Sequence, residues 1–479
     1  MSQKDSSSFD IGEARIWLAW LLPAMSGAAL SVIFTLYLAP SKYFAADLLA
    51  ALFLIICLGI FGFRRSGIMI GCKHLAPLLA MLLYVAVLAL ANGTEDGAQA
   101  YIKELMFGFI PFLLLYVVFR NQAPKQIPVL LLAVFLIPGI VHLAFMYLDI
   151  FVAAQKGNIP FSSPFKQGLL EYIKNAPRVG RRYLSWALLH LLCAGWLMTL
   201  PPKHVTTKYL AWGVIGLSIL SLALLDARAA YVSVAIGGMF LTLAIGPSRA
   251  WLRLKPFRPT GSGRVLLACF FIIVIGVGYS AGKSRWVAMS YSFEAAAHDV
   301  FDSDVKLSQR PFVDESFWSA PIKDINTCYR EGHFRCKVDQ SAYLRMAWVL
   351  TGMQSLLNHP FGIGYSDDYM GRLWGVAGEL DKFQRGDSFL IQHVVSFGVF
   401  SLLFYALLIW GVLHSIRRAV QTGYASIALV TVCGIILVCT GRGLVDVFSE
   451  GLWRYFMALL GMYYGLLHST VRPRANDLR

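Results

Sequence analysis

The segment AYLRMAWVLTGMQSLLNHPFGIGY, residues 342–365, combines residue types that can bind an anion and move a proton. Arg345 offers a fixed fork of N–H donors that suits two phosphate oxygens, and His359 can exchange a proton near neutral pH. The simpler alternatives are an arginine whose charged end reaches lipid headgroups and an ordinary loop histidine. The segment therefore predicts either a phosphate-binding site or a plain membrane-surface helix.

The spacing of apolar residues predicts a helix over 342–357, followed by a turn at Pro360 and its glycines. The apolar stripe comprises Leu344, Met346, Val349, Leu350, Met353, Leu356 and Leu357. Arg345, Trp348 and Ser355 fall nearer the opposite side. We expect this arrangement to let Arg345 present its guanidinium to a cavity.

A second segment, RGDSFLIQHVVSFGVF at 385–400, places a carboxylate just before a long apolar run. At that position Asp387 can serve as a general base. The competing interpretation is that Asp387 is the N-cap of the following helix, and the two roles are compatible. His393 lies about two turns further on, where a buried structural histidine is a simpler interpretation than a proton carrier.

A further arginine lies where two apolar runs meet. In LDARAAYVSV, Arg228 sits at a depth where an ionisable group is costly and is usually paired or functional. A structural pair with Asp226 is the alternative to anion binding. The stretch 151–182 adds a basic cluster, which indicates either a local anion or a solvated basic face. Its arginines are Arg178, Arg181 and Arg182.

The elements that must position these residues are apolar helices long enough to cross a bilayer. The chain has 479 residues, of which 57% are hydrophobic and 14% charged, a lower charged fraction than soluble proteins have. Apolar runs of about the required 20 residues recur along it. The twelve runs cover 16–39, 43–63, 74–92, 104–119, 127–150, 183–201, 208–225, 229–246, 265–282, 389–413, 423–440 and 451–468. The sequence thus predicts an all-α integral membrane protein with about 12 transmembrane helices.

Basic residues concentrate in alternate short loops, which places both termini in the cytoplasm because cytoplasmic loops collect lysine and arginine. Basic residues in the cytoplasmic loops then explain the net charge of +15, so no nucleic-acid partner is expected. Two longer loops, 151–182 and 283–388, fall on the outer side. We expect nine spans within 1–282, a large extracytoplasmic helical loop at 283–388, and three spans with a cytoplasmic tail in 389–479.

The large loop holds Cys328 and Cys336, which are separated by seven residues. A disulfide between them is expected if the outer side is oxidising, and zinc binding with His333 is the sharper alternative. Asp367 and Asp368 form an adjacent carboxylate pair that offers a less favoured metal site. The sequence has no nucleotide-binding glycine loop, and no metal or cofactor is expected.

The order of these segments resembles the O-antigen ligase family, membrane glycosyltransferases that complete lipopolysaccharide, within a wider ligase–polymerase superfamily. The resemblance covers roughly residues 180–465. It rests on DARAAYVS, on YLRMAW in the large outer loop, on the turn HPFGIG, and on DSFLIQHVVSFGVFS. Family members often carry His-Asn where this chain has Asp387-Ser388. The base is therefore either Asp387 or His359.

The resemblance implies a GT-C-like fold in the bacterial inner membrane, with an active site that faces the periplasm among membrane lipids. An undecaprenyl-diphosphate-linked O-antigen would be the donor and lipid A–core oligosaccharide the acceptor. Arg228 and Arg345, helped by Arg178, Arg181 or Arg182, would bind the diphosphate. A base would take the proton from the attacking hydroxyl, and single displacement would invert the anomeric configuration without metal or nucleotide.

The sequence leaves several other functions open. An O-antigen polymerase uses the same donor with a second lipid-linked repeat as acceptor, and a protein O-oligosaccharyltransferase uses a serine or threonine. A transporter or flippase of a lipid-linked anion also suits many spans and outer arginines, although it predicts basic residues deep within several spans. A scaffold without catalysis would leave the arginines and the candidate bases more than about 15 Å apart.

Overall fold

All the regular secondary structure of the described residues is helical, in a computed structural model of the chain. The structure describes residues 11–38, 42–61, 95–122, 126–156, 181–198, 205–224, 287–301, 310–313, 337–366, 369–375, 388–422, 425–443 and 450–471, with single positions at 83, 87, 233, 236, 237, 239, 240, 243 and 317. The all-α class is confirmed for these residues.

The helices have the following ends: α1 Ile11–Tyr37, α2 Tyr43–Phe61, α5 Glu95–Asn121, α6 Ile127–Gln155, α8 Arg181–Met198, α9 Val205–Leu224, α16 Gln340–Asn358, α17 Tyr369–Trp374, α18 Phe389–Phe397, α19 Val399–Thr422, α20 Ala425–Gly443 and α21 Glu450–Val471. A further helix covers 287–301. Helices therefore occur at nine of the twelve apolar runs. The other three runs, 74–92, 229–246 and 265–282, lie outside the described residues apart from single positions.

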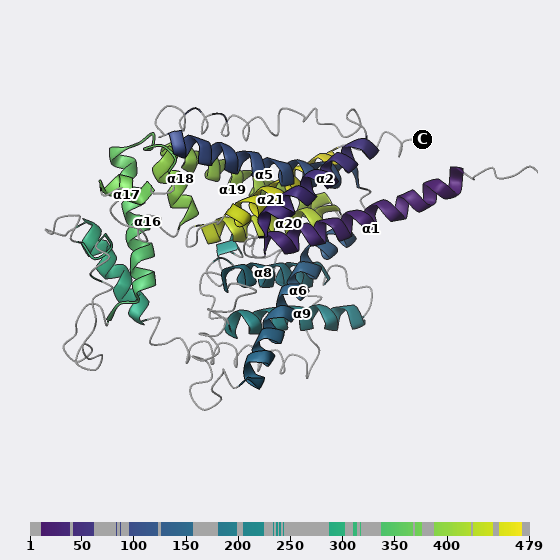
Figure 1. The fold of residues 1–479 in the computed structure, drawn as a ribbon, viewed down its shortest axis with the longest axis horizontal. Coiled ribbons are helices and arrows are strands. Elements are labelled where there is room, and N and C mark those ends of the chain that lie inside the picture. The colour runs from purple at the N-terminus through teal and green to yellow at the C-terminus, as the bar shows by residue number, and fades with distance from the viewer. Residues whose placement is uncertain are drawn as a thin grey trace, which may run out of the picture.

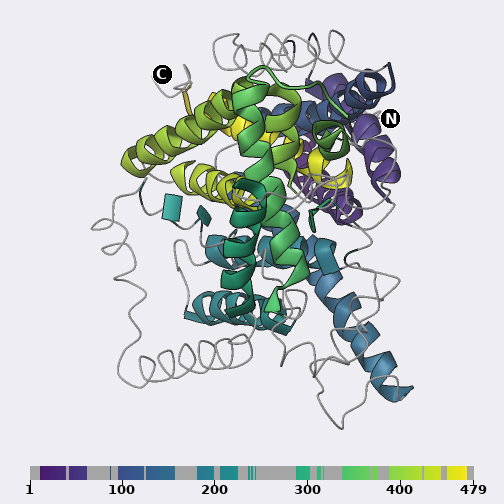
Figure 2. The same ribbon diagram turned by 90° about the vertical axis from the view of Figure 1, so that its left-hand side faces the viewer.

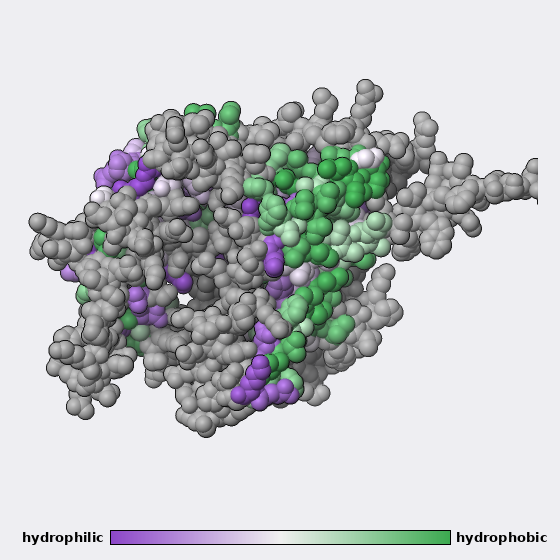
Figure 3. Space-filling model, in the orientation of Figure 1, coloured by the Kyte–Doolittle hydropathy of each residue, from purple (hydrophilic) through white to green (hydrophobic). Residues whose placement is uncertain are grey.

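Two helical segments in the described part of the chain are both long and apolar enough to cross a bilayer, namely Ile127–Val152 and Val399–Arg418. Six shorter apolar segments lie within α1, α2, α5, α8, α9 and α20. Exposed apolar side chains cover the outside of several of these helices. On α2 they are Phe44, Leu48, Leu49, Leu52, Ile55, Ile56 and Ile60, and on α6 they are Val129, Ile137, Ile140, Phe145, Leu148 and Phe151. Figure 3 shows a large hydrophobic area over α1 and α2.

The main core is shared by α1, α2, α5, α6, α8, α19, α20 and α21. Within it, α5 and α21 lie side by side (Figure 1). Glycine makes this close approach possible, because a Cβ at Gly461 would overlap the carbonyl oxygen of Phe112. The core thus fixes the helix ends that carry the buried charges described below.

A second, smaller core, which we call the end cluster, lies at one end of the molecule, to the left in Figure 1. Its buried residues are Ala296, Val300, Phe312, Val313, Tyr343, Leu344, Ala347, Trp348, Tyr369, Met370, Trp374, Ile391 and Val395. Figure 2 faces this end and shows α16 running across the helices behind it. The helix expected over 342–357 is confirmed as α16, whose N-cap is Asp339, with Oδ1 accepting from the N–H of Ala342 at 3.1 Å.

Gly398 separates α18 from α19, so the expectation of one continuous helix over 389–413 is wrong. Gly398 has a φ of +63°, and a Cβ there would overlap the carbonyl oxygen of Pro360. The turn that follows α16 packs into this break, where the N–H of Val399 donates to the Pro360 carbonyl at 2.8 Å. The turn therefore ties α16 to the start of α19.

The face of α16 that packs against the protein matches the expected apolar stripe only in part, since Leu344 is buried and Met346, Val349 and Leu350 pack against the end cluster. The buried residues are Tyr343, Leu344, Ala347, Trp348, Thr351 and Ser355. Trp348 and Ser355 therefore do not lie on an open side, and that expectation is wrong. The reason is Gly352, whose missing side chain lets α16 approach Ile391 closely. Two residues of the expected stripe, Met353 and Leu357, are instead 44% and 83% exposed.

Candidate functional site

Two of the site residues expected from the sequence, Arg345 and His359, have side chains within the described residues. Arg181 and Arg182 form the first turn of α8, and their side chains lie outside that part. The residues that lie outside it altogether are Arg178, Asp226, Arg228, Cys328, His333, Cys336, Asp367, Asp368 and Asp387. The expected disulfide, its zinc alternative and the Asp387 base accordingly stay predictions.

Arg345 and His359 lie at different places along one helix. Arg345 is half-buried in the first part of α16, whereas His359 is the exposed C-cap, with its N–H donating to the Ser355 carbonyl at 2.7 Å. A helix rises about 1.5 Å per residue, so the Cα atoms of Arg345 and His359 are about 20 Å apart. A hydroxyl that attacks beside a bound diphosphate needs its base within hydrogen-bond reach. This separation favours a base near residue 387 over His359.

Ser388, the neighbour of Asp387, joins three helices. Its hydroxyl caps α18 by accepting from the N–H of Ile391 at 3.3 Å, and it donates to the carbonyl of Gly443, the last residue of α20, at 3.1 Å. The hydroxyl of Tyr369 on α17 donates to the Ser388 carbonyl at 3.3 Å. The interpretation of Asp387 as the N-cap is therefore wrong, because Ser388 performs that role.

Arg442 lies directly before the Gly443 carbonyl that binds Ser388. Its side chain is only 2% exposed, and its guanidinium carbon lies 4.7 Å from the centre of the Trp186 ring. Trp186 comes about one turn after Arg181 and Arg182 in α8. Trp186 therefore links α8 to the end of α20, which in turn contacts the start of α18 through Ser388.

Arg372 is a second cation that sequence reasoning missed. It lies three residues after Tyr369 on α17, which puts both side chains on one face of the helix. Its Nη1 is buried and has no hydrogen-bond acceptor in the part of the chain that the structure describes. The same holds for the indole N–H groups of Trp348 and Trp374 in the end cluster. A buried donor without an acceptor costs about 1–3 kcal/mol, a cost that oxygens of a bound anion would remove.

A third buried arginine is already neutralised. Arg454 on α21 forms an ion pair with Asp47 on α2, with Nε and Oδ2 3.0 Å apart, and Tyr37 donates to the other oxygen of Asp47 at 3.0 Å. The Arg454 guanidinium carbon also lies 4.9 Å from the Phe107 ring centre. These residues join α1, α2, α5 and α21. We assign this arginine a structural role rather than an anion-binding one.

His393 is the buried structural histidine that the sequence favours. It lies on α18, is 8% exposed, and its Nδ1 shares a hydrogen bond of 2.9 Å with the hydroxyl of Tyr405 on α19. Phe389 and Trp453 pack against its ring. The pair joins α18 to α19 across the break at Gly398.

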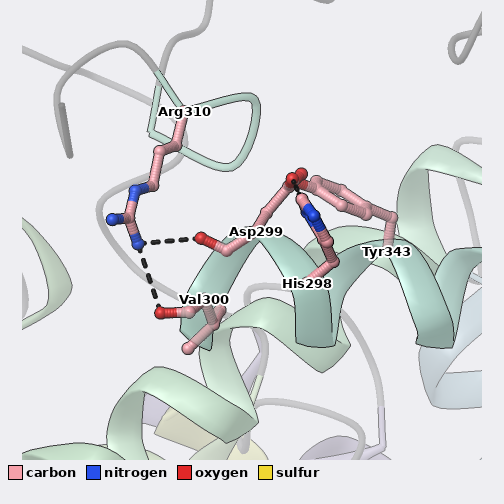
Figure 4. Close-up of polar contacts among 5 residues, drawn as sticks. All are labelled: His298, Asp299, Val300, Arg310 and Tyr343. Carbon is pink, nitrogen blue, oxygen red and sulfur yellow. Dashed lines mark hydrogen bonds and ion pairs between the residues drawn. The ribbon is translucent and has the colours of Figure 1, made fainter. Parts of the chain in front are cut away.

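Polar contacts hold helix 287–301 against α16 (Figure 4). The Tyr343 hydroxyl donates to the Asp299 carboxylate, and Asp299 lies 3.5 Å from Nδ1 of the exposed His298. Burial and the hydrogen bond to Asp299 raise the pKa of Tyr343 well above its usual value, so its hydroxyl stays protonated. Arg310 donates to the carbonyls of Asp299 and Val300 at 2.8 and 3.2 Å, which caps the end of the helix.

The described residues contain no group of three or more His, Cys, Asp or Glu side chains placed to hold a metal ion. Comparison of the chain with protein-family models, curated proteins and solved structures finds no match. The chemistry around Ser388 is that of two arginines with a buried guanidinium nitrogen, Arg442 and Arg372, on the two helices that hydrogen-bond with it.

Proposed function

We propose that this chain is an O-antigen ligase of the bacterial inner membrane, an inverting glycosyltransferase that uses a lipid-linked donor. The observation that carries the proposal is the contact of α17 and α20 with Ser388, the residue that follows Asp387 in the chain. Arg442 directly precedes the Gly443 carbonyl that accepts from Ser388, and Arg372 shares a face of α17 with Tyr369, which donates to the Ser388 carbonyl. Cations next to a carboxylate suit a reaction in which a diphosphate leaves and a hydroxyl attacks.

Membrane insertion is the first part of the proposal. It is supported by the apolar segments of α6 and α19 and by the exposed apolar side chains of α2 and α6. With about 12 spans and cytoplasmic termini, the ends of α18, α20 and α21 near Ser388 belong to the periplasmic side. The site then faces the leaflet that holds a translocated polyprenyl-diphosphate donor.

In the proposed mechanism, arginines bind the diphosphate of undecaprenyl-diphosphate-linked O-antigen. Arg442 and Arg372 join Arg345 and Arg228 in this role, with the basic residues at the start of α8 beside them. Asp387 takes the proton from a hydroxyl of the lipid A–core acceptor. That oxygen bonds to the anomeric carbon as the bond from this carbon to the diphosphate oxygen breaks, and the electron pair leaves with undecaprenyl diphosphate. One displacement inverts the anomeric carbon, and the mechanism uses no metal or cofactor.

The test is transfer by the purified protein in lipid vesicles that contain the undecaprenyl-diphosphate glycan and lipid A–core, with a chelator and without ATP. We expect the conjugate to appear on a gel. The variants Arg442→Gln, Arg372→Gln and Asp387→Asn should each slow its formation by about a hundredfold. The matched control is Arg417→Gln, which removes an exposed arginine from the other end of α19.

The products also separate the alternatives. A glycan ladder on undecaprenyl diphosphate, without attachment to lipid A–core, would identify an O-antigen polymerase. Transfer to a serine or threonine of a protein would identify a protein O-oligosaccharyltransferase. A folded protein that forms no conjugate with any acceptor and moves the donor across the vesicle membrane would contradict the enzyme and support a transporter.

A further inference from the structure

The side of α16 that faces away from the protein carries apolar side chains in the second half of the helix. Successive helical residues are about 100° apart, so the residues opposite the buried face can be identified from their positions. In the second half of the helix they are Met353, Leu356 and Leu357, whereas Met346 and Val349 pack against the end cluster. Leu357 is 83% exposed, Met353 is 44% exposed and Leu356 is half-buried. The end cluster therefore leaves the apolar outward side of the second half of α16 outside its packing.

The turn that follows α16 brings one exposed aromatic ring against the start of α19. Phe361, which is 59% exposed, stacks on Phe400 with ring centres 6.1 Å apart. On α19 the exposed apolar residues recur on one side of the helix. They are Val399, Leu403, Leu407 and Trp410, between 47% and 67% exposed. We call the outward apolar residues of α16, Phe361 and this stripe of α19 together the α16–α19 surface.

The stripe of α19 indicates what covers this surface. α19 contains one of the two segments in the described residues that are long and apolar enough to span a bilayer, so its exposed stripe faces lipid in the proposed membrane placement. In Figure 2 α16 runs steeply across α19. With α19 spanning the bilayer as proposed, α16 then runs along the membrane surface, as an interfacial helix does. A helix of this kind buries its apolar face about 5–10 Å into the boundary between headgroups and acyl chains.

We propose that the outward face of α16, together with Phe361, inserts into the periplasmic leaflet and contacts the acyl chains of the bilayer. The proposal rests on the membrane placement given under the proposed function, but not on the reaction. The hydrogen bond from Val399 to Pro360 sets the depth of α16 relative to the start of α19. His359, at the end of α16, then lies at the level of the lipid headgroups, which fits its exposure better than a role as the catalytic base does.

The experiment measures lipid contact directly at three positions of the full-length protein in vesicles. A fluorescent amino acid whose emission reports its surroundings is incorporated in place of Leu357, Leu403 or Ser290. Leu403 is the reference for a lipid-facing position on α19. Ser290 is the matched control, because it is exposed on helix 287–301, outside the α16–α19 surface. Each protein is compared in vesicles with plain or chain-brominated phosphatidylcholine, and with iodide in the surrounding water.

We expect brominated chains to quench the label at 357 and at 403, and iodide to quench the label at 290. Quenching of the label at 357 by iodide alone, with lipid quenching at 403, would overturn the insertion of α16 and leave the membrane placement intact. Protection of position 357 from both quenchers would also overturn it, since protein would then cover the surface. Absence of lipid quenching at both 357 and 403 would contradict the membrane placement itself.

Discussion

Arg454 on α21 and Asp47 on α2 form an ion pair in which both side chains are about 5% exposed or less. An arginine and a carboxylate so far from water stabilise each other only as a pair, because either charge alone would be buried without compensation. Tyr37 donates to the same carboxylate, so α1, α2 and α21 are joined at one point.

Removal of one partner should therefore destabilise the protein strongly. We expect Arg454→Leu to lower the free energy of unfolding by about 3–5 kcal/mol, because Asp47 loses its counter-ion. The double variant Asp47→Asn, Arg454→Leu should recover part of that loss. Denaturant unfolding in detergent measures both values. Equal stability of the wild type and Arg454→Leu would show that the pair does not hold these helices.

The break at Gly398 should tolerate no side chain. Gly398→Ala adds a Cβ that overlaps the Pro360 carbonyl, whereas Gly375→Ala, also at a positive φ, meets no atom within 4 Å. We expect conformational strain to lower the free energy of unfolding by about 1–2 kcal/mol in the control Gly375→Ala. The free energy of unfolding should fall further in Gly398→Ala. Hydrogen exchange should show faster exchange at the amides of Ile363, Gly364 and Val399 only in Gly398→Ala. The same exchange rates in both variants would contradict the close packing of the turn.

The hydrogen bond from Tyr343 to Asp299 should make stability depend on pH at the alkaline end. The pKa of Tyr343 is raised by burial, whereas an unfolded tyrosine has a pKa of about 10. Above that pH the unfolded chain releases a proton that the folded chain keeps, so the stability contributed by Tyr343 falls as pH rises. We expect unfolding free energy to drop more steeply above pH about 10 in the wild type than in Tyr343→Phe.

The matched control for this prediction is Tyr291→Phe, which changes a tyrosine that is 52% exposed on helix 287–301. Tyr291→Phe should leave unchanged the slope of unfolding free energy against pH in the alkaline range. At neutral pH, Tyr343→Phe should cost about 1–2 kcal/mol through the lost hydrogen bond, since the Asp299 carboxylate loses a donor. Identical stability of the two variants at every pH would contradict the role given to Tyr343.

The rate of transfer should depend on the shape of the charged group at position 442 and not only on its charge. Arg442→Lys keeps a cation but loses the planar fork and the stacking on Trp186. We expect kcat/KM for transfer to fall in both variants, by about a hundredfold in Arg442→Gln and by less in Arg442→Lys. Initial rates over a range of donor concentrations check this, with unfolding curves to confirm that both variants fold. Wild-type rates in both variants would show that Arg442 does not belong to the site.

The sequence predicts the helices well and their contacts less well. Apolar runs of about 20 residues mark nine helices because that pattern depends only on local composition. The break at Gly398 was missed because a single glycine inside an apolar run carries no sign of the turn that approaches it from 38 residues earlier. The buried face of α16 was misjudged in part because apolar residues occur around most of this helix, so periodicity does not show which side packs against α18.

The sequence draws attention to only some of the residues of the candidate site. Arg345 and the segment before α18 stand out because a charge beside an apolar run is conspicuous. Arg442, in GRG at the end of a span, and Arg372, in a short helix of a long loop, look like ordinary helix-end cations in the sequence. Their relation to Ser388 depends on the packing of α17 and α20 against α18, which no local pattern contains.

The most direct test of the central claim is photo-crosslinking of an undecaprenyl-diphosphate glycan that carries a photoreactive group on its first sugar. The modified residues are identified by mass spectrometry after irradiation in vesicles. We predict crosslinks in α17, at the start of α18 near Ser388 and at the end of α20 near Arg442, all suppressed by unlabelled donor. Suppressible crosslinks at the opposite helix ends, around Arg120 or Arg417, or no suppressible crosslinks at all, would contradict the proposed site.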